Sequence, residues 1–207
     1  MPSELGRLRI YGCGDVEVDH VIEYLNDFRT AYNTILVFEE NIERINRAWR
    51  RYPFPPDFAW ASFGGSVRIS DAEITALVPK SEQLVLSGVA LQSPGFWDFL
   101  GKLNPLEVIR QYLNDRHERR KDREYREGAE ERRLNIENVI LANQAIAGVI
   151  SNAKALGATD QDLAPLLNQL VYRPLEMLDH HQDRGTIDNA EIPTDPPSAR
   201  KRTSRGG

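Results

Sequence analysis

Nineteen consecutive residues in the middle of the chain, from Asp115 to Arg133, are almost all charged: eight are basic and seven are acidic. Such a segment cannot enter a hydrophobic core, because buried charges are tolerated only when each one is paired. Opposite charges recur four residues apart, as in Asp115–Arg119 and Asp122–Arg126, a spacing that stabilises a solvated helix. The chain must therefore place its packed parts on either side of an exposed helical segment.

The prolines set the length of that helix. Asn104, Pro105 and Glu107 form a typical helix start, with a capping residue, a proline at the first position and a carboxylate at the third. No further proline occurs before Pro165, and Gly157 supplies a stop. We predict one helix of about 50 residues between Asn104 and Gly157, about 75 Å long at 1.5 Å per residue.

Composition limits the class of protein. The chain has 207 residues, 41% of them hydrophobic, which is enough for a core. A net charge of −5 argues against bulk nucleic-acid binding and against docking on anionic lipid. The single cysteine, Cys13, excludes an internal disulfide framework. Because no apolar run reaches the roughly 20 residues of a membrane span and the start lacks a signal-peptide pattern, we expect a soluble, cytoplasmic protein.

Residues 1–103 contain the strand signals. We predict strands at 8–11 and 83–91, and a hairpin of two strands around Gly64-Gly65. Apolar spacing predicts a helix over 15–52 and a short helix over 71–77. The order strand, helix, strand, strand, short helix, strand is that of the βαββαβ, or ferredoxin-like, motif. The predicted fold class is therefore α+β, with a ferredoxin-like head.

The segment 95–102, GFWDFLGK, has a glycine–lysine spacing one residue too long for a phosphate-binding loop. Leu103 also stands where a Ser or Thr should bind magnesium. We interpret the segment as a short amphipathic turn whose core residues are Phe96, Trp97, Phe99 and Leu100. The alternative is a partner-binding pocket around the Ser-Pro-Gly turn, formed by Ser93, Pro94, Gly95, Phe96 and Trp97.

The C-terminal part of the predicted long helix is apolar again, and a further helix follows to about Asp183, kinked at Pro174. Two helices joined by a short loop predict an antiparallel hairpin. The apolar stripe is too wide for one partner helix, so we predict a homo-oligomer, a dimer by preference. Its interface would contain Ile136, Val139, Asn143, Ile146, Val149 and Ile150. The alternative is that the hairpin folds back on the head within one chain.

No pattern predicts a catalytic residue, a cofactor site or a metal site. Gly12-Cys13-Gly14 follows a strand, but Glu17 occupies the place of the third glycine of a dinucleotide fingerprint. His180 and His181 are adjacent, and adjacent residues of a helix diverge by about 100°. We therefore interpret them as solvent-facing side chains near a helix C-terminus, where positive charge is favoured.

Residues 84–113 combine a strand, the turn Ser93-Pro94-Gly95, a short apolar segment and the helix start Asn104-Pro105. This order resembles a signature of a group of bacterial α+β proteins, in which a short apolar helix and a long second helix follow the turn. The resemblance covers a minor part of the chain. It implies an α+β head joined to a helical stalk, and it carries no activity, cofactor or site residue to this chain.

These observations predict three parts: an α+β head at 1–103, a long helix with a helical hairpin at 104–184, and a disordered tail at 185–207. The leading interpretation is a non-enzymatic interaction or oligomerisation protein, an adaptor or scaffold whose head binds a protein partner and whose helices act as spacer and assembly element. The alternative is a nucleic-acid-associated or regulatory protein that uses the head sheet or the basic tail.

Overall fold

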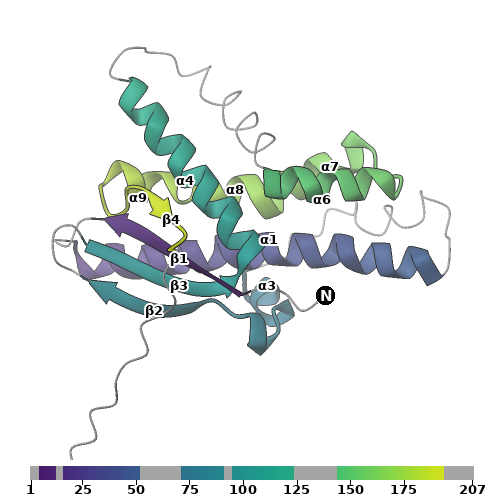
Figure 1. The fold of residues 1–207 in the computed structure, drawn as a ribbon, viewed down its shortest axis with the longest axis horizontal. Coiled ribbons are helices and arrows are strands. Elements are labelled where there is room, and N and C mark those ends of the chain that lie inside the picture. The colour runs from purple at the N-terminus through teal and green to yellow at the C-terminus, as the bar shows by residue number, and fades with distance from the viewer. Residues whose placement is uncertain (1–4, 13–15, 52–70, 91–94, 124–143, 194–207) are drawn as a thin grey trace, which may run out of the picture.

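The computed structural model of the protein describes residues 5–12, 16–51, 71–90, 95–123 and 144–193, which form an α+β fold (Figure 1). Within these ranges the sheet has four strands, β1 (Leu5–Gly12), β2 (Val85–Ala90), β3 (Gly95–Lys102) and β4 (Ala190–Glu191). They lie in the order β2-β3-β1-β4, and each neighbouring pair is antiparallel. β1 and β3 pair along their whole length and form the centre of the sheet.

A long helix, α1 (Val18–Arg51), packs against one face of the sheet. Its buried aromatic residues recur at four-residue steps, at Tyr24, Phe28 and Tyr32, and therefore share one side of the helix. Phe28 stacks on Phe99 of β3 with ring centroids 4.2 Å apart. The Tyr32 hydroxyl accepts a hydrogen bond of 2.8 Å from the backbone N–H of Lys102, which fixes the end of β3 to α1.

Shorter helices surround α1. They are α3 (Asp71–Leu77), the 3-10 turn η1 (Lys80–Glu82), α4 (Leu103–Arg123), α6 (Gln144–Ala155), α7 (Asp160–Leu167), the π-type turn η2 (Asn168–Tyr172), α8 (Arg173–Glu176) and α9 (Asp179–Asp183). α6, η2 and α8 contact α1, and α4 contacts β1, β3 and α6. Figure 1 shows α6, α7 and α8 running alongside α1, on the side away from β2. None of the helices in the described ranges is long and apolar enough to cross a membrane.

Several predicted elements are confirmed. The strand predicted at 8–11 lies in β1, the helix predicted over 15–52 is α1, and the helix predicted over 71–77 is α3. The strand predicted at 83–91 contains β2. The hairpin predicted around Gly64-Gly65 lies outside the described residues.

The turn predicted over 95–102 is wrong, because these residues form β3. Trp97 and Phe99 are buried on the side of α1, whereas Phe96 and Leu100 are half-buried on the opposite face. This alternation is the period of two that a strand imposes on its side chains. The apolar residues predicted to share one core are thus divided between the two faces of the sheet.

The apolar sequence of residues 84–91 predicts that Leu84, Leu86, Val89 and Leu91 are well protected, and this is wrong for Leu86 and Val89. β2 lies at the end of the described sheet, and three of its apolar side chains are exposed: Val85 by 52%, Leu86 by 43% and Val89 by 43%. A run of β-branched and leucine side chains indicates a strand, but it does not tell an inner strand from an outer one.

The described residues do not form the single straight helix predicted from 104 to 156. α4 and α6 contact one another, which two segments of one straight helix cannot do. Residues 124–143, which hold part of the charged segment, lie outside the description.

The disordered tail was predicted to start at Gly185, and this is wrong for residues 185–193. Here the chain returns to the sheet and forms β4, with Ala190 opposite Ile10 of β1. The side-chain amide of Asn114 in α4 donates to the carbonyl of Ala190, and its oxygen accepts from the N–H of Ala190, at 2.8 and 2.9 Å. Hydrogen bonds to β1 and to Asn114 satisfy backbone groups of this segment and hold it in place. The polar sequence of the segment gives no sign of these distant partners.

The boundary between a head at 1–103 and a helical part at 104–184 stays a prediction. Buried apolar residues from both sides of this boundary belong to one hydrophobic cluster, which includes Leu8 and Phe99 of the sheet and Leu170 and Leu175 of the helices. The fourth described strand comes from residues 190–191, beyond both predicted parts.

Candidate functional site

The partner pocket predicted around Trp97 is not formed by the described residues. Trp97 is only 4% exposed and meets Tyr24 of α1 edge to face, with centroids 5.6 Å apart. Phe96 is half-buried beneath the guanidinium of Arg9, 4.1 Å from its ring centroid. Gly95 is buried, and Ser93 and Pro94 lie outside the described residues. Trp97 is therefore a core residue.

The residues predicted to form a dimer interface are partly covered within one chain. Ile146 and Val149 are buried in the core, and Ile150 is half-buried against it. Ile136, Val139 and Asn143 lie outside the described residues. The alternative to a dimer, in which the helical hairpin folds back within one chain, thus accounts for the burial of Ile146 and Val149. Self-association stays a prediction and needs another surface.

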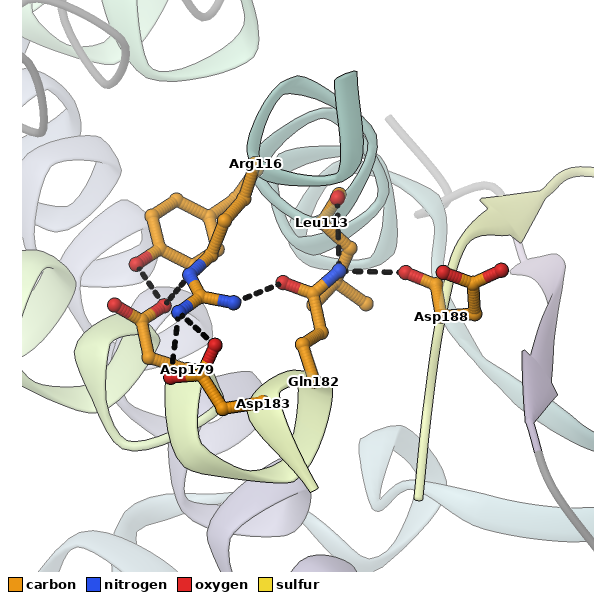
Figure 2. Close-up of polar contacts among 7 residues, drawn as sticks. Leu113, Arg116, Asp179, Gln182, Asp183 and Asp188 are labelled. Atoms are coloured by element: carbon orange, nitrogen blue, oxygen red, sulfur yellow. Dashed lines mark hydrogen bonds and ion pairs between the residues drawn. The ribbon is translucent and has the colours of Figure 1, made fainter. Parts of the chain in front are cut away.

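Polar side chains concentrate around the short helix α9, and one group of them binds α4 (Figure 2). The guanidinium of Arg116 in α4 lies 2.8 Å from Asp179 and 3.2 Å from the Gln182 side-chain oxygen, and donates to both carboxylate oxygens of Asp183 at 3.0 Å. The amide nitrogen of Gln182 donates to the backbone carbonyl of Leu113 at 3.0 Å. This α4–α9 network attaches a five-residue helix that has few apolar contacts of its own.

Tyr112 extends the α4–α9 network. Its hydroxyl donates to Asp179 at 2.6 Å. Burial, together with the neighbouring carboxylate of Asp179, raises the pKa of Tyr112 far above its ordinary value. Burial also raises the pKa of Asp179, despite the hydrogen bonds from Tyr112 and Arg116. Both shifts follow from the low exposure of the network and favour a structural role.

A second group of polar side chains lies on the other side of α9, against α1. His181 is 0% exposed, and its Nε2 lies 2.9 Å from Asp27 Oδ2. His180 Nε2 lies 3.5 Å from Glu23 Oε1 and 3.8 Å from Asp27 Oδ2. The other oxygen of Glu23 accepts from Arg184 at 2.8 Å. Glu23, His180 and His181 each bring one potential ligand atom within 4.8 Å of the others.

The sheet face opposite α1 carries an ion cluster. Asp98 of β3 is 1% exposed and accepts from Arg9 at 2.8 and 3.0 Å and from Arg7. Tyr11 lies opposite Phe96 in the β1–β3 register, and its hydroxyl donates to Glu191 at 2.5 Å. Aromatic and basic side chains therefore share this face, but their polar groups already bind partners within the chain.

A further feature is β2, the last strand of the described sheet, whose exposed side chains Val85, Leu86 and Val89 are here called the β2 edge patch. In the β2–β3 register, Leu86 and Val89 lie on the face of the sheet that packs on α1, and Val85 lies on the opposite face. The six residues of β2, VLSGVA, contain neither a charged residue nor a proline. Soluble proteins commonly protect an outer strand with such residues. A register shift between Leu86 and Gly88 twists the strand but leaves the patch exposed.

Comparisons of the chain with protein-family models, with curated proteins and with solved structures found no match. The function is therefore argued from the α9 contacts, the ion cluster on the sheet and the β2 edge patch alone.

Sequence reasoning missed the carboxylates that face the histidines. Glu23 and Asp27 are four residues apart, so both lie on the same side of α1. Their distance in sequence from His181 exceeds 150 positions, which removes any local signal of the pairing. The two histidine rings also do not diverge, because their centroids lie 3.7 Å apart.

Proposed function

We propose that this is a non-enzymatic interaction protein that self-associates by pairing the β2 strands of two copies. The observation that carries the proposal is the β2 edge patch: three apolar side chains, each more than 40% exposed, on the last strand of the described sheet. An outer strand offers unpaired backbone N–H and C=O groups to a further strand. Burial of exposed apolar side chains adds a favourable free energy of association that an outer strand with polar side chains lacks.

A second copy is the occupant that the patch fits most simply. Two outer strands of identical chains can pair antiparallel about a two-fold axis, so that one surface is complementary to itself. The residues of β2 are uncharged, so the two copies bring no like charges together at the contact. This proposal replaces the interface expected around Ile146 and Val149, which the same chain buries.

The arrangement of the strands supports the finer assignment of a ferredoxin-like sheet. β1 and β2 flank β3 and are both antiparallel to it, so they run parallel to each other, with α1 between them in sequence. In the same way β3 and β4 flank β1, with helices between them in sequence. Each half is a βαβ unit split by a strand of the other half, which is the order of that motif.

Light scattering on the full chain tests self-association. We expect the mass of two chains at tens of micromolar concentration. Leu86→Lys and Val89→Lys should each give the mass of one chain, because a lysine on an outer strand opposes strand addition. Ile22→Lys is the matched control, because Ile22 is 53% exposed but lies on α1, away from the strand. Thermal unfolding should show that all three variants stay folded.

A wild-type mass of one chain at these concentrations would contradict the proposal. A dimer that survives both lysine substitutions, or that Ile22→Lys dissociates, would place the interface elsewhere.

Nucleic-acid binding by the outer sheet face is the second candidate. The net charge of −5 argues against bulk nucleic-acid binding, but β3 presents Phe96 opposite Tyr11 of β1 in the centre of the described sheet. Aromatic residues on the central strands of such a sheet are typical of RNA-binding modules. Against it, Asp98 neutralises charge from Arg7 and Arg9, and Arg9 covers the Phe96 ring.

Fluorescence anisotropy with a labelled single-stranded RNA at low salt separates the two candidates. The interaction proposal expects no saturable binding at micromolar protein. Saturable binding that Phe96→Ala abolishes would favour the nucleic-acid function instead.

A further inference from the structure

Four side chains from opposite ends of the sequence meet between α1 and α9. Glu23 and Asp27 lie on one side of α1, and His180 and His181 lie on α9 with their rings 3.7 Å apart between centroids. Two imidazole groups and two carboxylates are donors that several divalent transition metals accept. The group is distinct from the β2 edge patch, and the proposed function makes no use of it.

The hydrogen bonding of the two histidines is incomplete. The Nδ1 atom of His181 is buried and has no hydrogen-bond partner, and the buried Nε2 atom of His180 faces Glu23 and Asp27 at 3.5 and 3.8 Å without forming a hydrogen bond. His181 itself is 0% exposed. A buried nitrogen without a partner is unfavourable, so unpaired groups of this kind require an explanation, such as an ion.

The contacts of His181 leave one of its ring nitrogens available. Nε2 lies 2.9 Å from Asp27 Oδ2, whereas the buried Nδ1 has no hydrogen-bond partner. A ring nitrogen with a free lone pair is what a metal ion requires. The close approach of the two rings also disfavours charging both, because two imidazolium groups at this separation repel.

We propose that Glu23, His180 and His181 bind a divalent transition-metal ion, with Zn²⁺ as the best match to two nitrogens and a carboxylate oxygen. The three ligand atoms lie within 4.8 Å of one another. Ligands of a tetrahedral zinc ion lie about 3.4 Å apart at bond lengths near 2.1 Å, so binding requires the ligand atoms to approach by at most about 1.4 Å. Such an approach is within the reach of side-chain rotation.

The surroundings of Glu23 and His181 support this assignment. Glu23 uses Oε2 for Arg184 and presents Oε1 to His180, so one carboxylate serves both partners. Asp27 Oδ2 lies within 4 Å of the Nε2 atoms of both histidines and is an additional oxygen donor or a hydrogen-bond partner that orients them. The ion would link α9, and with it the start of the segment that forms β4, to α1.

Titration calorimetry of the tag-free full chain with ZnCl₂, after removal of metal by a chelator, tests the site. A Cys13→Ser background removes the one thiol as a competing ligand. We expect one Zn²⁺ per chain with a dissociation constant in the micromolar range or below. His180→Ala and Glu23→Gln should each weaken binding by about tenfold or more. Both residues are partly exposed, so both variants are expected to fold.

His117→Ala is the matched control, because His117 also faces a carboxylate, that of Asp188 at 2.5 Å, but lies on α4, which supplies no ligand to the proposed site. It should leave Zn²⁺ affinity unchanged. Co²⁺ gives a second readout: a site with nitrogen ligands and low coordination number produces visible absorption much stronger than that of the hydrated ion.

Three results would overturn the proposal: no Zn²⁺ binding at hundreds of micromolar metal, an affinity that neither His180→Ala nor Glu23→Gln changes, or a Co²⁺ spectrum identical to that of the hydrated ion. Because the dimer test uses β2 variants and no metal, the two proposals succeed or fail separately.

Discussion

Asp98 lies in the middle of β3, 1% exposed, between two arginines of β1. Burial alone would raise the pKa of its carboxyl group, but hydrogen bonds from Arg9 and Arg7 outweigh burial and hold the pKa below its ordinary value. A carboxylate whose pKa is lowered by folding stabilises the folded state. This contribution is complete above the unfolded pKa of about 3.9 and is lost as the pH falls through the lower folded-state value.

We expect Asp98→Asn to lower the free energy of unfolding by about 2 kcal/mol at neutral pH, because the arginines lose their counter-charge while the shape of the side chain is kept. Urea unfolding at several pH values measures the loss. The difference between wild type and variant should shrink as the pH falls below the folded-state pKa of Asp98. A difference that stays constant down to the acid limit would contradict the ion-cluster account.

Gly12, at the end of β1, lies directly against the backbone of the returning chain. A Cβ atom at this position would lie 2.1 Å from the carbonyl oxygen of Thr186, closer than any real contact. Because that neighbour is a backbone atom, a side chain at position 12 could be accommodated only if the segment after α9 moved. Gly148 in α6 is the opposite case, because a Cβ there meets nothing within 4 Å.

Gly12→Ala should therefore destabilise the protein by about 1–3 kcal/mol, the cost of an overpacked site. Gly148→Ala should stabilise it by about 0.5–1 kcal/mol, because alanine is the better helix former. Thermal and urea unfolding of both variants give the comparison. Equal effects of the same sign would show that residue 186 does not lie against β1.

Contacts between residues so far apart in the chain could not be predicted from the sequence. Asp98 is separated from Arg7 and Arg9 by 91 and 89 positions, and Gly12 meets a residue near the other end of the chain. Local spacing reports neighbours within one helical turn or across one hairpin. It predicted that the first strand ends before Gly12, but not what Gly12 or Asp98 faces.

At the scale of elements, α9 depends on side chains from both of its neighbours. It has five residues, too few for a stable isolated helix. Asp179, Gln182 and Asp183 bind Arg116 of α4, while His180 and His181 face α1. The position of α9 is thus determined by polar contacts on two sides, and the chain after it leads directly to β4.

Arg116→Lys tests the α4–α9 network. Lysine keeps the charge but cannot reproduce the planar fork by which Arg116 binds Asp179, Gln182 and Asp183 together. We expect faster amide hydrogen exchange across residues 179–191, with little change in β1 and β3. Glu17→Gln is a suitable control, because Glu17 is an exposed carboxylate whose side chain lies near His20 of α1. Unchanged exchange over 179–191 would contradict the role given to Arg116.

The elements also show what periodicity can and cannot predict. The spacing of Val21, Leu25, Phe28 and Tyr32 correctly predicted α1, since a helix face is a local property. β3 was misread as a turn because Phe96 to Leu100 is apolar on both faces except for Asp98, so no polar–apolar alternation was visible. The two faces are apolar for different reasons, one covered by α1 and the other by Arg9.

At the scale of the molecule, the last described residues complete the sheet that the first residues begin. β4 pairs with β1, and α6, η2 and α8 pack on α1, so the apolar stripe of the C-terminal helices is buried by the chain itself. The sequence predicted an α+β chain with one fully apolar C-terminal helix face. It did not predict this return, because a stripe such as that of Ile146 and Val149 does not specify which surface covers it.

Within the described residues, the β2 edge patch is a group of exposed apolar side chains on a sheet strand, and the central claim is that a second copy covers it. Amide hydrogen exchange of residues 85–90, measured on the full chain at low and high protein concentration, tests this claim most directly. Pairing of two β2 strands predicts that amides of β2 exchange more slowly at high concentration, while those of β1 and β3 do not change. Exchange of β2 that is independent of concentration would contradict the account.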